Sequence, residues 1–186
     1  MFKIETDRLF MREWNADDAQ ILFDMNDDPL VVRYTGDRAF TSLDEARELI
    51  RTYDHYQLYG HGRWLCTLKS NDEIVGWCGL KRIDEDGDKF VDLGYRFFQK
   101  HWGKGYATES SFASLKFGFE KIGCEEIVAR AVKENEASIH VIRKLGFSFW
   151  KGAGCHGLPA EYYRLRREDF NKLVQGNSYP YSVAFK

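Results

Sequence analysis

The sequence predicts a single α/β domain in which helices flank a mixed, mostly antiparallel sheet. Apolar residues alternate with polar ones through residues 63–98, in segments separated by turn residues, which predicts an antiparallel meander. A long helical pattern follows, then a strand, a helix and two strands, so one parallel crossover is expected in the sheet. At 186 residues the chain is long enough to bury one sizeable core.

The N-terminal part predicts one strand and two helices. Residues 6–14 are expected to form an opening strand. Asn15 is expected to cap a helix that ends at Asp28, because the residue before Pro29 avoids the helical region. Ser42 and Glu45 have the spacing of a capping box, which predicts the start of a second helix. Both helices are expected on one flank of the sheet.

The rest of the chain divides into alternating strand and helix patterns, followed by an extension. We expect a domain over residues 1–175 and a C-terminal extension over 176–186, which has turn residues but no periodicity and should be poorly tied to the rest. The expected strands cover residues 63–68, 74–83, 90–98, 126–132, 147–150 and 161–165, and the expected helices cover 104–121, 135–145 and 167–174.

Composition narrows the classes of partner. The formal net charge is only −2, with basic and acidic residues interspersed, so neither nucleic acid nor a membrane surface is expected as a partner. No apolar stretch approaches the roughly 18 residues of a membrane span, and the N-terminus lacks signal-peptide features, so a cytoplasmic protein is expected. Widely spaced cysteines without a C-x-x-C pair predict reduced thiols and no metal site; these are Cys66, Cys78, Cys124 and Cys155.

The most informative segment is residues 98–107, where a strand end runs through Gly103 and Gly105 into the long helix. The first amides of a helix have no internal partner and attract anions, and glycine allows close backbone approach, so the turn suits a polyphosphate. A simple glycine-permitted turn is the alternative. A P-loop is excluded because Tyr106 follows Gly105, and a dinucleotide fingerprint is excluded because the third glycine is missing.

Three separated motifs carry a family resemblance. They are Thr6-Asp7-Arg8-Leu9 with Arg12, Leu93-Gly94-Tyr95 leading into Trp102-Gly103-Lys104-Gly105-Tyr106-Ala107-Thr108-Glu109, and Asn135-Glu136-Ala137-Ser138 ending in Lys144-Leu145-Gly146-Phe147. With these motifs, residues 5–167 resemble the GNAT N-acetyltransferase superfamily, most closely the branch that includes ribosomal-protein N-terminal acetyltransferases. The resemblance implies the GNAT fold and direct attack of a primary amine on acetyl-CoA through a tetrahedral intermediate.

The resemblance also implies a cofactor site. The coenzyme A pyrophosphate would be held by the amides of Trp102, Gly103, Lys104, Gly105, Tyr106 and Ala107. Lys100 stands where the family usually has Gln or Arg, and the backbone at Phe97 and Phe98 would pair with the pantetheine arm. Asn135 would contact the cofactor near its thiol end, although an ordinary helix N-cap is an equally good interpretation of this residue.

Two residues are candidates for the chemistry. Asp92 interrupts an apolar strand and aligns with a carboxylate of the resembling branch, so we expect it to accept a proton through water. The alternatives are a solvated strand residue and an ion pair with a nearby arginine. The tyrosine that many GNAT enzymes use as general acid is replaced by Ile142. Ser138 is therefore the candidate donor to the leaving sulfur, with a capping role as the alternative. Glu109 is expected to favour the helix N-terminus.

The acceptor is the least defined part. The first hypothesis is a protein N-terminus, followed by a free amino acid, a polyamine or an amine drug, and association of two identical chains is left open. The acceptor is expected near Arg33, Tyr34, Trp64 and a loop at residues 152–159. A non-catalytic acyl-CoA-binding module is the alternative class, because the usual tyrosine is missing. An RNA-associated factor has little support, because aromatic residues do not alternate with a basic patch.

Overall fold

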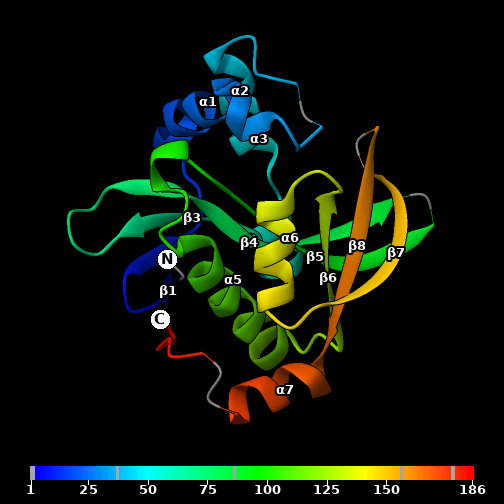
Figure 1. Cartoon of the computed structure of the whole chain (residues 1–186). Helices are drawn as coiled ribbons and strands as arrows, with labels where there is room; N and C mark the ends of the chain where they lie inside the picture. The colour runs from blue at the N-terminus through cyan, green and yellow to red at the C-terminus, as the bar shows by residue number, and fades with distance from the viewer. Residues whose placement is uncertain (1–2, 37, 86, 156, 177–178) are drawn as a thin grey trace.

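The computed structural model describes residues 3–36, 38–85, 87–155, 157–176 and 179–186 (Figure 1). Its strands are β1 (Lys3–Glu5), β2 (Leu9–Arg12), β3 (Arg63–Leu68), β4 (Ile74–Glu85), β5 (Asp88–Phe97), β6 (Glu126–Val132), β7 (Ser148–Cys155), β8 (Leu158–Arg166) and β9 (Ala184–Phe185). Its α-helices are α1 (Ala19–Asp27), α2 (Pro29–Val32), α3 (Leu43–Thr52), α4 (His55–Tyr59), α5 (Tyr106–Phe117), α6 (Glu136–Lys144) and α7 (Arg167–Gln175). Short helical turns cover Ala16–Asp18, Gln99–His101 and Gly118–Ile122.

The described strands form one sheet in the order β7-β8-β6-β5-β4-β3-β2-β1-β9. Strands β5 and β6 are parallel and are joined through α5, whereas the other pairs of described strands are antiparallel. This arrangement confirms the predicted mixed, mostly antiparallel sheet. The parallel pair is β5 and β6, and not the later strands on either side of α6 from which the crossover was expected. The meander of β3, β4 and β5 also lies where the period-two pattern predicted it.

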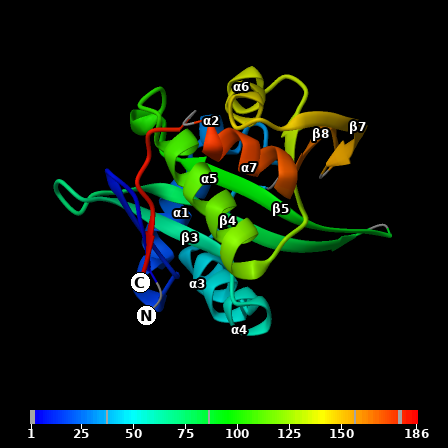
Figure 2. The same ribbon diagram turned by 90° about the horizontal axis from the view of Figure 1, so that it is seen from below.

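Helices cover both faces of the sheet. Figure 2 shows α5 and α7 on one side of β3, β4 and β5, and α3 and α4 on the other. The main core lies between the sheet and α5, where Leu80, Leu93 and Phe112 are buried. A smaller core packs α1 and α3 together through Leu22 and Ala46. In the part of the chain that the structure describes, no helix is long and apolar enough to span a bilayer.

The opening segment differs from the single strand expected over residues 6–14. It forms a hairpin of β1 and β2, in which the Thr6 amide donates to the Leu9 carbonyl over 2.9 Å. The hairpin begins before the expected strand because Thr6 and Arg8 are held by a buried carboxylate of α5, described below. A tertiary contact of this kind leaves no periodicity in the local sequence.

The second helix starts as predicted, but the capping box is wrong. Ser42 is the N-cap residue of α3, yet its side chain makes no capping hydrogen bond. Glu45 instead accepts hydrogen bonds from the Thr41 amide (3.0 Å) and from Arg38 Nη2 (2.9 Å). Arg38 therefore binds the Glu45 carboxylate, which the predicted capping box would have used to accept the N-cap amide.

Residues 179–186 of the C-terminal tail pack against the rest of the protein, so the expectation of a poorly tied tail is wrong for this described part. Strand β9 pairs with β1, and the Lys3 and Lys186 amides each donate to the other's carbonyl over 2.9 Å. Tyr179 stacks on Phe112 of α5 with ring centroids 4.8 Å apart. Aromatic burial and edge pairing thus tie the tail without any repeating pattern.

Candidate active site

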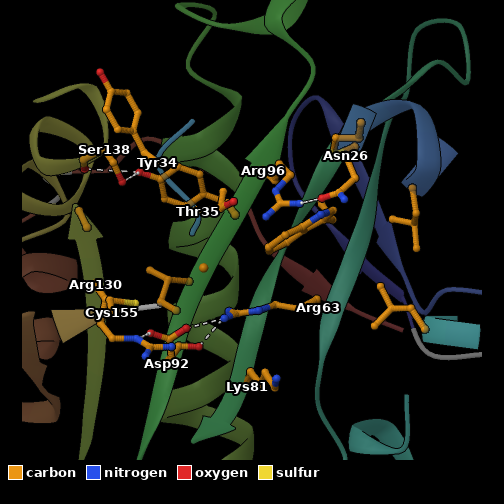
Figure 3. A pocket seen from close by; sticks show the side chains of 18 of the residues that line it. Asn26, Tyr34, Thr35, Arg63, Lys81, Asp92, Arg96, Arg130, Ser138 and Cys155 are labelled. Carbon is orange, nitrogen blue, oxygen red and sulfur yellow. Dashed lines mark hydrogen bonds and ion pairs between the residues drawn. The ribbon is translucent and has the colours of Figure 1, made fainter. Parts of the chain in front are cut away.

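The site begins where β5 and β6 separate. Their parallel ladder contains only the pairs Asp92–Val128 and Leu93–Ala129, although β5 continues to Phe97 and β6 to Val132. Beyond Leu93 the strands diverge, and a cleft of about 660 Å³ extends from this gap to the face covered by α1 and α3. Figure 3 shows side chains of both strands pointing into it.

The edge of β5 presents backbone groups to the gap. The Phe98 amide donates to Val75 of β4 over 3.1 Å, so by the alternation of an antiparallel ladder the N–H and C=O of Phe97 point toward β6. The Phe97 carbonyl accepts a hydrogen bond from Trp102 Nε1 at 2.8 Å. The Phe97 N–H therefore faces a gap in which no described strand pairs with it.

The glycine turn leads into an open helix start. Gly103 and Gly105 have φ values of 71° and 81°, a region that favours glycine. Gly105 is the N-cap residue of α5 and provides no side-chain cap, so the first amides of the helix are open to an anion. Trp102, Gly103, Lys104 and Gly105 are exposed at this turn. The backbone at this turn therefore suits an anion, and pyrophosphate binding there stays a prediction.

A buried carboxylate connects the opening motif to this turn. Glu109 accepts hydrogen bonds from Thr6 Oγ1 (2.6 Å) and from Arg8 N and Nε (2.9 and 2.6 Å). Arg8 Nη1 donates to the Lys104 carbonyl at 2.9 Å, and its guanidinium lies 4.7 Å from the Tyr106 ring centroid. Glu109 was expected to favour the helix dipole, but its oxygens hold the segment that supports the turn.

The Arg8→Met variant is expected to raise the KM for acetyl-CoA about fivefold to tenfold while leaving kcat within about twofold. It removes the support at Lys104 but keeps a side chain that covers Tyr106, and one lost charged hydrogen bond corresponds to about 1.4 kcal/mol or tenfold in affinity. Steady-state kinetics with varied acetyl-CoA measure the effect. Arg47→Met, at an exposed pair on α3, is the control. An unchanged KM would contradict the support role.

Two predicted cofactor residues have clear partners within the protein. Lys100 Nζ lies 2.6 Å from Glu73 Oε1, and this exposed pair sits beside the glycine turn. Asn135 Oδ1 accepts from the Ser138 amide at 3.1 Å, so Asn135 caps α6 and also lines the cleft. The capping interpretation is therefore correct, and it leaves the predicted cofactor contact compatible with the geometry.

Ser138 is paired with a phenol that the sequence analysis did not single out. Tyr95 Oη lies 2.9 Å from Ser138 Oγ, across the gap between β5 and α6. Burial raises the pKa of Tyr95, so its hydroxyl keeps its proton at neutral pH. Ile142 is buried in the core. Alternation along β5 puts Tyr95 on the side of Leu93 and Phe97, and this was the signal available in the sequence.

Asp92 is held by two arginines, one from β3 and one from β6. Its Oδ1 lies 3.0 Å from Arg130 Nε, its Oδ2 pairs with Arg63 Nη2, and all three side chains are largely buried. Figure 3 shows the two guanidinium groups approaching Asp92 from opposite sides. A Cβ on Gly94 would lie 2.7 Å from Arg63 Nη2, so this glycine makes room for the guanidinium. Asp92 therefore forms the ion pair that was the alternative interpretation of this residue. Proton acceptance by Asp92 stays a prediction.

One wall of the cleft is formed by aromatic residues of β4 and of the segments that flank the early helices. They are Trp14, Tyr34, Phe40, Tyr53 and Trp77. Tyr34 thus lies where it was expected. Trp64 does not: it is fully buried and packs edge-on against Phe117 of α5, 5.2 Å between centroids. The loop expected over residues 152–159 is mostly strand, because β7 continues to Cys155 and β8 starts at Leu158; position 156 lies outside the described residues.

The fold and site together define a class of acyl-CoA-dependent transferases. Residues 8–148 match the family model described as an acetyltransferase (GNAT) domain. The chain belongs to this family and is an acetyl-CoA-dependent acyltransferase. It is 32% identical over 148 residues to an uncharacterized N-acetyltransferase, p20, of Bacillus licheniformis, covering 79% of this chain and 83% of the relative.

Two further relatives are named for their acceptor. The chain is 24% identical over 138 residues to the spermidine N(1)-acetyltransferase of Escherichia coli K12, with coverage of 74% and 72%. A solved spermidine N-acetyltransferase of Vibrio cholerae, in complex with CoA and spermine, has a TM-score of 0.74 at 17% identity, covering 88% of this chain and 98% of that one. This structural likeness supports the GNAT fold.

Proposed function

We propose that this acetyltransferase transfers the acetyl group of acetyl-CoA directly to a primary amine bound in the cleft. The observation that carries the proposal is the gap between β5 and β6. The open start of α5 and the Phe97 amide lie beside this gap, and the acceptor cleft opens from it toward α1 and α3. Donor and acceptor can therefore meet at the gap from different sides of the sheet.

The donor would be held mainly by backbone groups. In our proposal, the amides of Trp102 to Ala107 bind the pyrophosphate at the helix start, where anions are favoured. Phe97 and Phe98 line the path of the pantetheine arm, with the Phe97 N–H as the donor that points into the gap. Lys100 adds positive charge beside the turn, and Asn135 borders the thiol end from α6.

The bound thioester supplies the acetyl group, and the chain's own hydroxyls supply a proton. Ser138 Oγ donates its proton to the leaving sulfur, while Tyr95 Oη donates to Ser138 Oγ and stabilises the oxygen that loses the proton. The raised pKa of Tyr95, caused by burial, keeps this phenol protonated over the physiological range. The pair would replace the tyrosine that is absent at Ile142.

The amine must reach the gap as a neutral group. Asp92 is the candidate acceptor for its proton, through water, but both of its oxygens already accept from guanidinium groups. An α-amine, with a pKa of about 8, needs less help than a lysine-like amine at about 10.4. This difference favours the N-terminus of a protein or peptide over a polyamine. Kinship with ribosomal-protein enzymes, dimer formation and a cytoplasmic location stay predictions.

Thiol release from acetyl-CoA with a panel of amines tests the proposal. The panel contains short peptides, free amino acids and polyamines, and the acetylated product is identified by mass. Product formation with one class supports amine acetylation. Tight acetyl-CoA binding without product for any amine, including folded proteins with free N-termini, would instead favour the non-catalytic binding module.

A further inference from the structure

The charges in the cleft are distributed unevenly. Among the described residues that line it, each carboxylate is already ion-paired. Glu45 pairs with Arg38, Glu48 pairs with Arg51, and Asp92 is shared by two arginines. Arg38 holds the pKa of Glu45 well below its usual range, at about 2, so this carboxylate stays charged and matched. The described wall therefore offers no unmatched carboxylate to a second ammonium group of an acceptor.

Lys81 adds a positive charge to the wall of the cleft. It lies on β4 directly across from Asp92, on the face that borders the cleft, and its side chain lines the cleft (Figure 3). Its ammonium makes no ion pair or hydrogen bond with any described residue. Asp92, its cross-strand neighbour, is already occupied by Arg63 and Arg130. Lys81 thus presents an unmatched positive charge to whatever fills the cleft.

Another part of the cleft wall is apolar and aromatic. The Trp14 and Trp77 ring centroids are 6.4 Å apart in an edge-on arrangement, and the Trp14 and Tyr53 ring centroids are 4.7 Å apart with the rings tilted. The indole Nε1 of Trp14 is buried without a hydrogen-bond partner among the described residues. A ligand that reaches this wall can bury apolar surface there and also offer an acceptor atom to the indole.

We infer that the acceptor is an amine that also carries a carboxylate and an apolar body, and that Lys81 binds the carboxylate. The inference rests on the proposed function and specifies its substrate class. A free apolar amino acid or a short apolar peptide satisfies all three features. A polyamine satisfies only the first, and its second ammonium would approach Lys81 with like charge.

The experiment compares matched acceptors. The dipeptide Phe-Gly and its C-terminal amide differ only in the carboxylate, and spermidine represents the polyamines. In the wild-type enzyme, kcat/KM for the acid is expected to exceed that for the amide about tenfold, the value of one charged contact. Lys81→Gln should bring this ratio close to one by raising the KM for the acid, with little change in kcat. Lys81→Glu should reverse the preference in favour of spermidine.

Lys89→Gln is the matched control, because Lys89 belongs to the same hairpin but pairs with Asp84 outside the cleft. It should keep the wild-type ratio. Transfer without preference for the acid, or a preference that survives Lys81→Gln, would overturn the inference while leaving the proposed function intact. No product with any amine would overturn the proposed function, and the inference with it.

Discussion

Replacing Tyr95 with phenylalanine and Ser138 with alanine together is expected to lower kcat by about a hundredfold, the lower range for loss of a positioned proton donor. Each single change should cost nearly as much as both, because the two hydroxyls lie 2.9 Å apart and act in sequence on one proton. The affinity for acetyl-CoA should stay within about twofold, since neither side chain lies at the glycine turn. Stopped-flow thiol detection and equilibrium binding measure the two quantities.

Tyr179→Phe is the control for this experiment. It also removes a phenolic hydroxyl, but from the tail, where the ring stacks on Phe112. It should leave kcat unchanged. If Tyr95→Phe and Ser138→Ala reduced kcat by less than about threefold, the pair would be a structural contact and the sulfur would leave without a proton from the protein.

The Asp92→Ala variant is expected to lower the free energy of unfolding by about 3 to 5 kcal/mol. It leaves the Arg63 and Arg130 guanidinium groups buried without their common partner, and an uncompensated buried charge has a cost of this size. Denaturant unfolding monitored by tryptophan fluorescence measures it. Asp84→Ala, which breaks an exposed pair with Lys89 on the same hairpin, should cost under about 1 kcal/mol.

Asp92→Asn separates the structural role of Asp92 from its predicted chemical role. The amide oxygen still accepts a hydrogen bond, so part of the stability should return relative to alanine. If Asp92 accepts the proton of the amine through water, the asparagine variant should lose activity at neutral pH and regain it at high pH, where the amine is already neutral. An unchanged pH profile of kcat would restrict Asp92 to holding the two arginines.

The strands and helices whose formation depends on local sequence patterns were predicted from the sequence. The meander of β3, β4 and β5 follows from alternation. Helix α5 and the helical turn after it follow from their apolar spacing and from the αL Gly123 that ends this turn. The opening hairpin and the ordered tail depend on contacts between residues about 70 to 180 positions apart, such as Arg8 with Glu109 and Lys3 with Lys186. Such contacts have no period, so the sequence could not predict them.

The residues of the site also divide into those that local sequence patterns predict and those that depend on contacts between distant segments. The glycine turn was predictable, because positive φ and an uncapped helix start require particular residues at particular places. The pairing of Tyr95 with Ser138 was not, because it depends on how far β5 separates from α6. The double ion pair of Asp92 was anticipated only as one of two alternatives, since Arg63 and Arg130 come from strands on either side of β5.

The packing of the tail against α5 makes its protease resistance a measure of donor binding. Tyr179 and Tyr181 both contact Phe112, and the same helix begins at the turn proposed to bind the pyrophosphate. A ligand that binds only while the tail is packed on α5 lowers, by mass action, the population of molecules in which the tail is detached. Trimming by carboxypeptidase should therefore slow in proportion to the occupancy of the donor site, so the end of the chain can report on a site it does not touch.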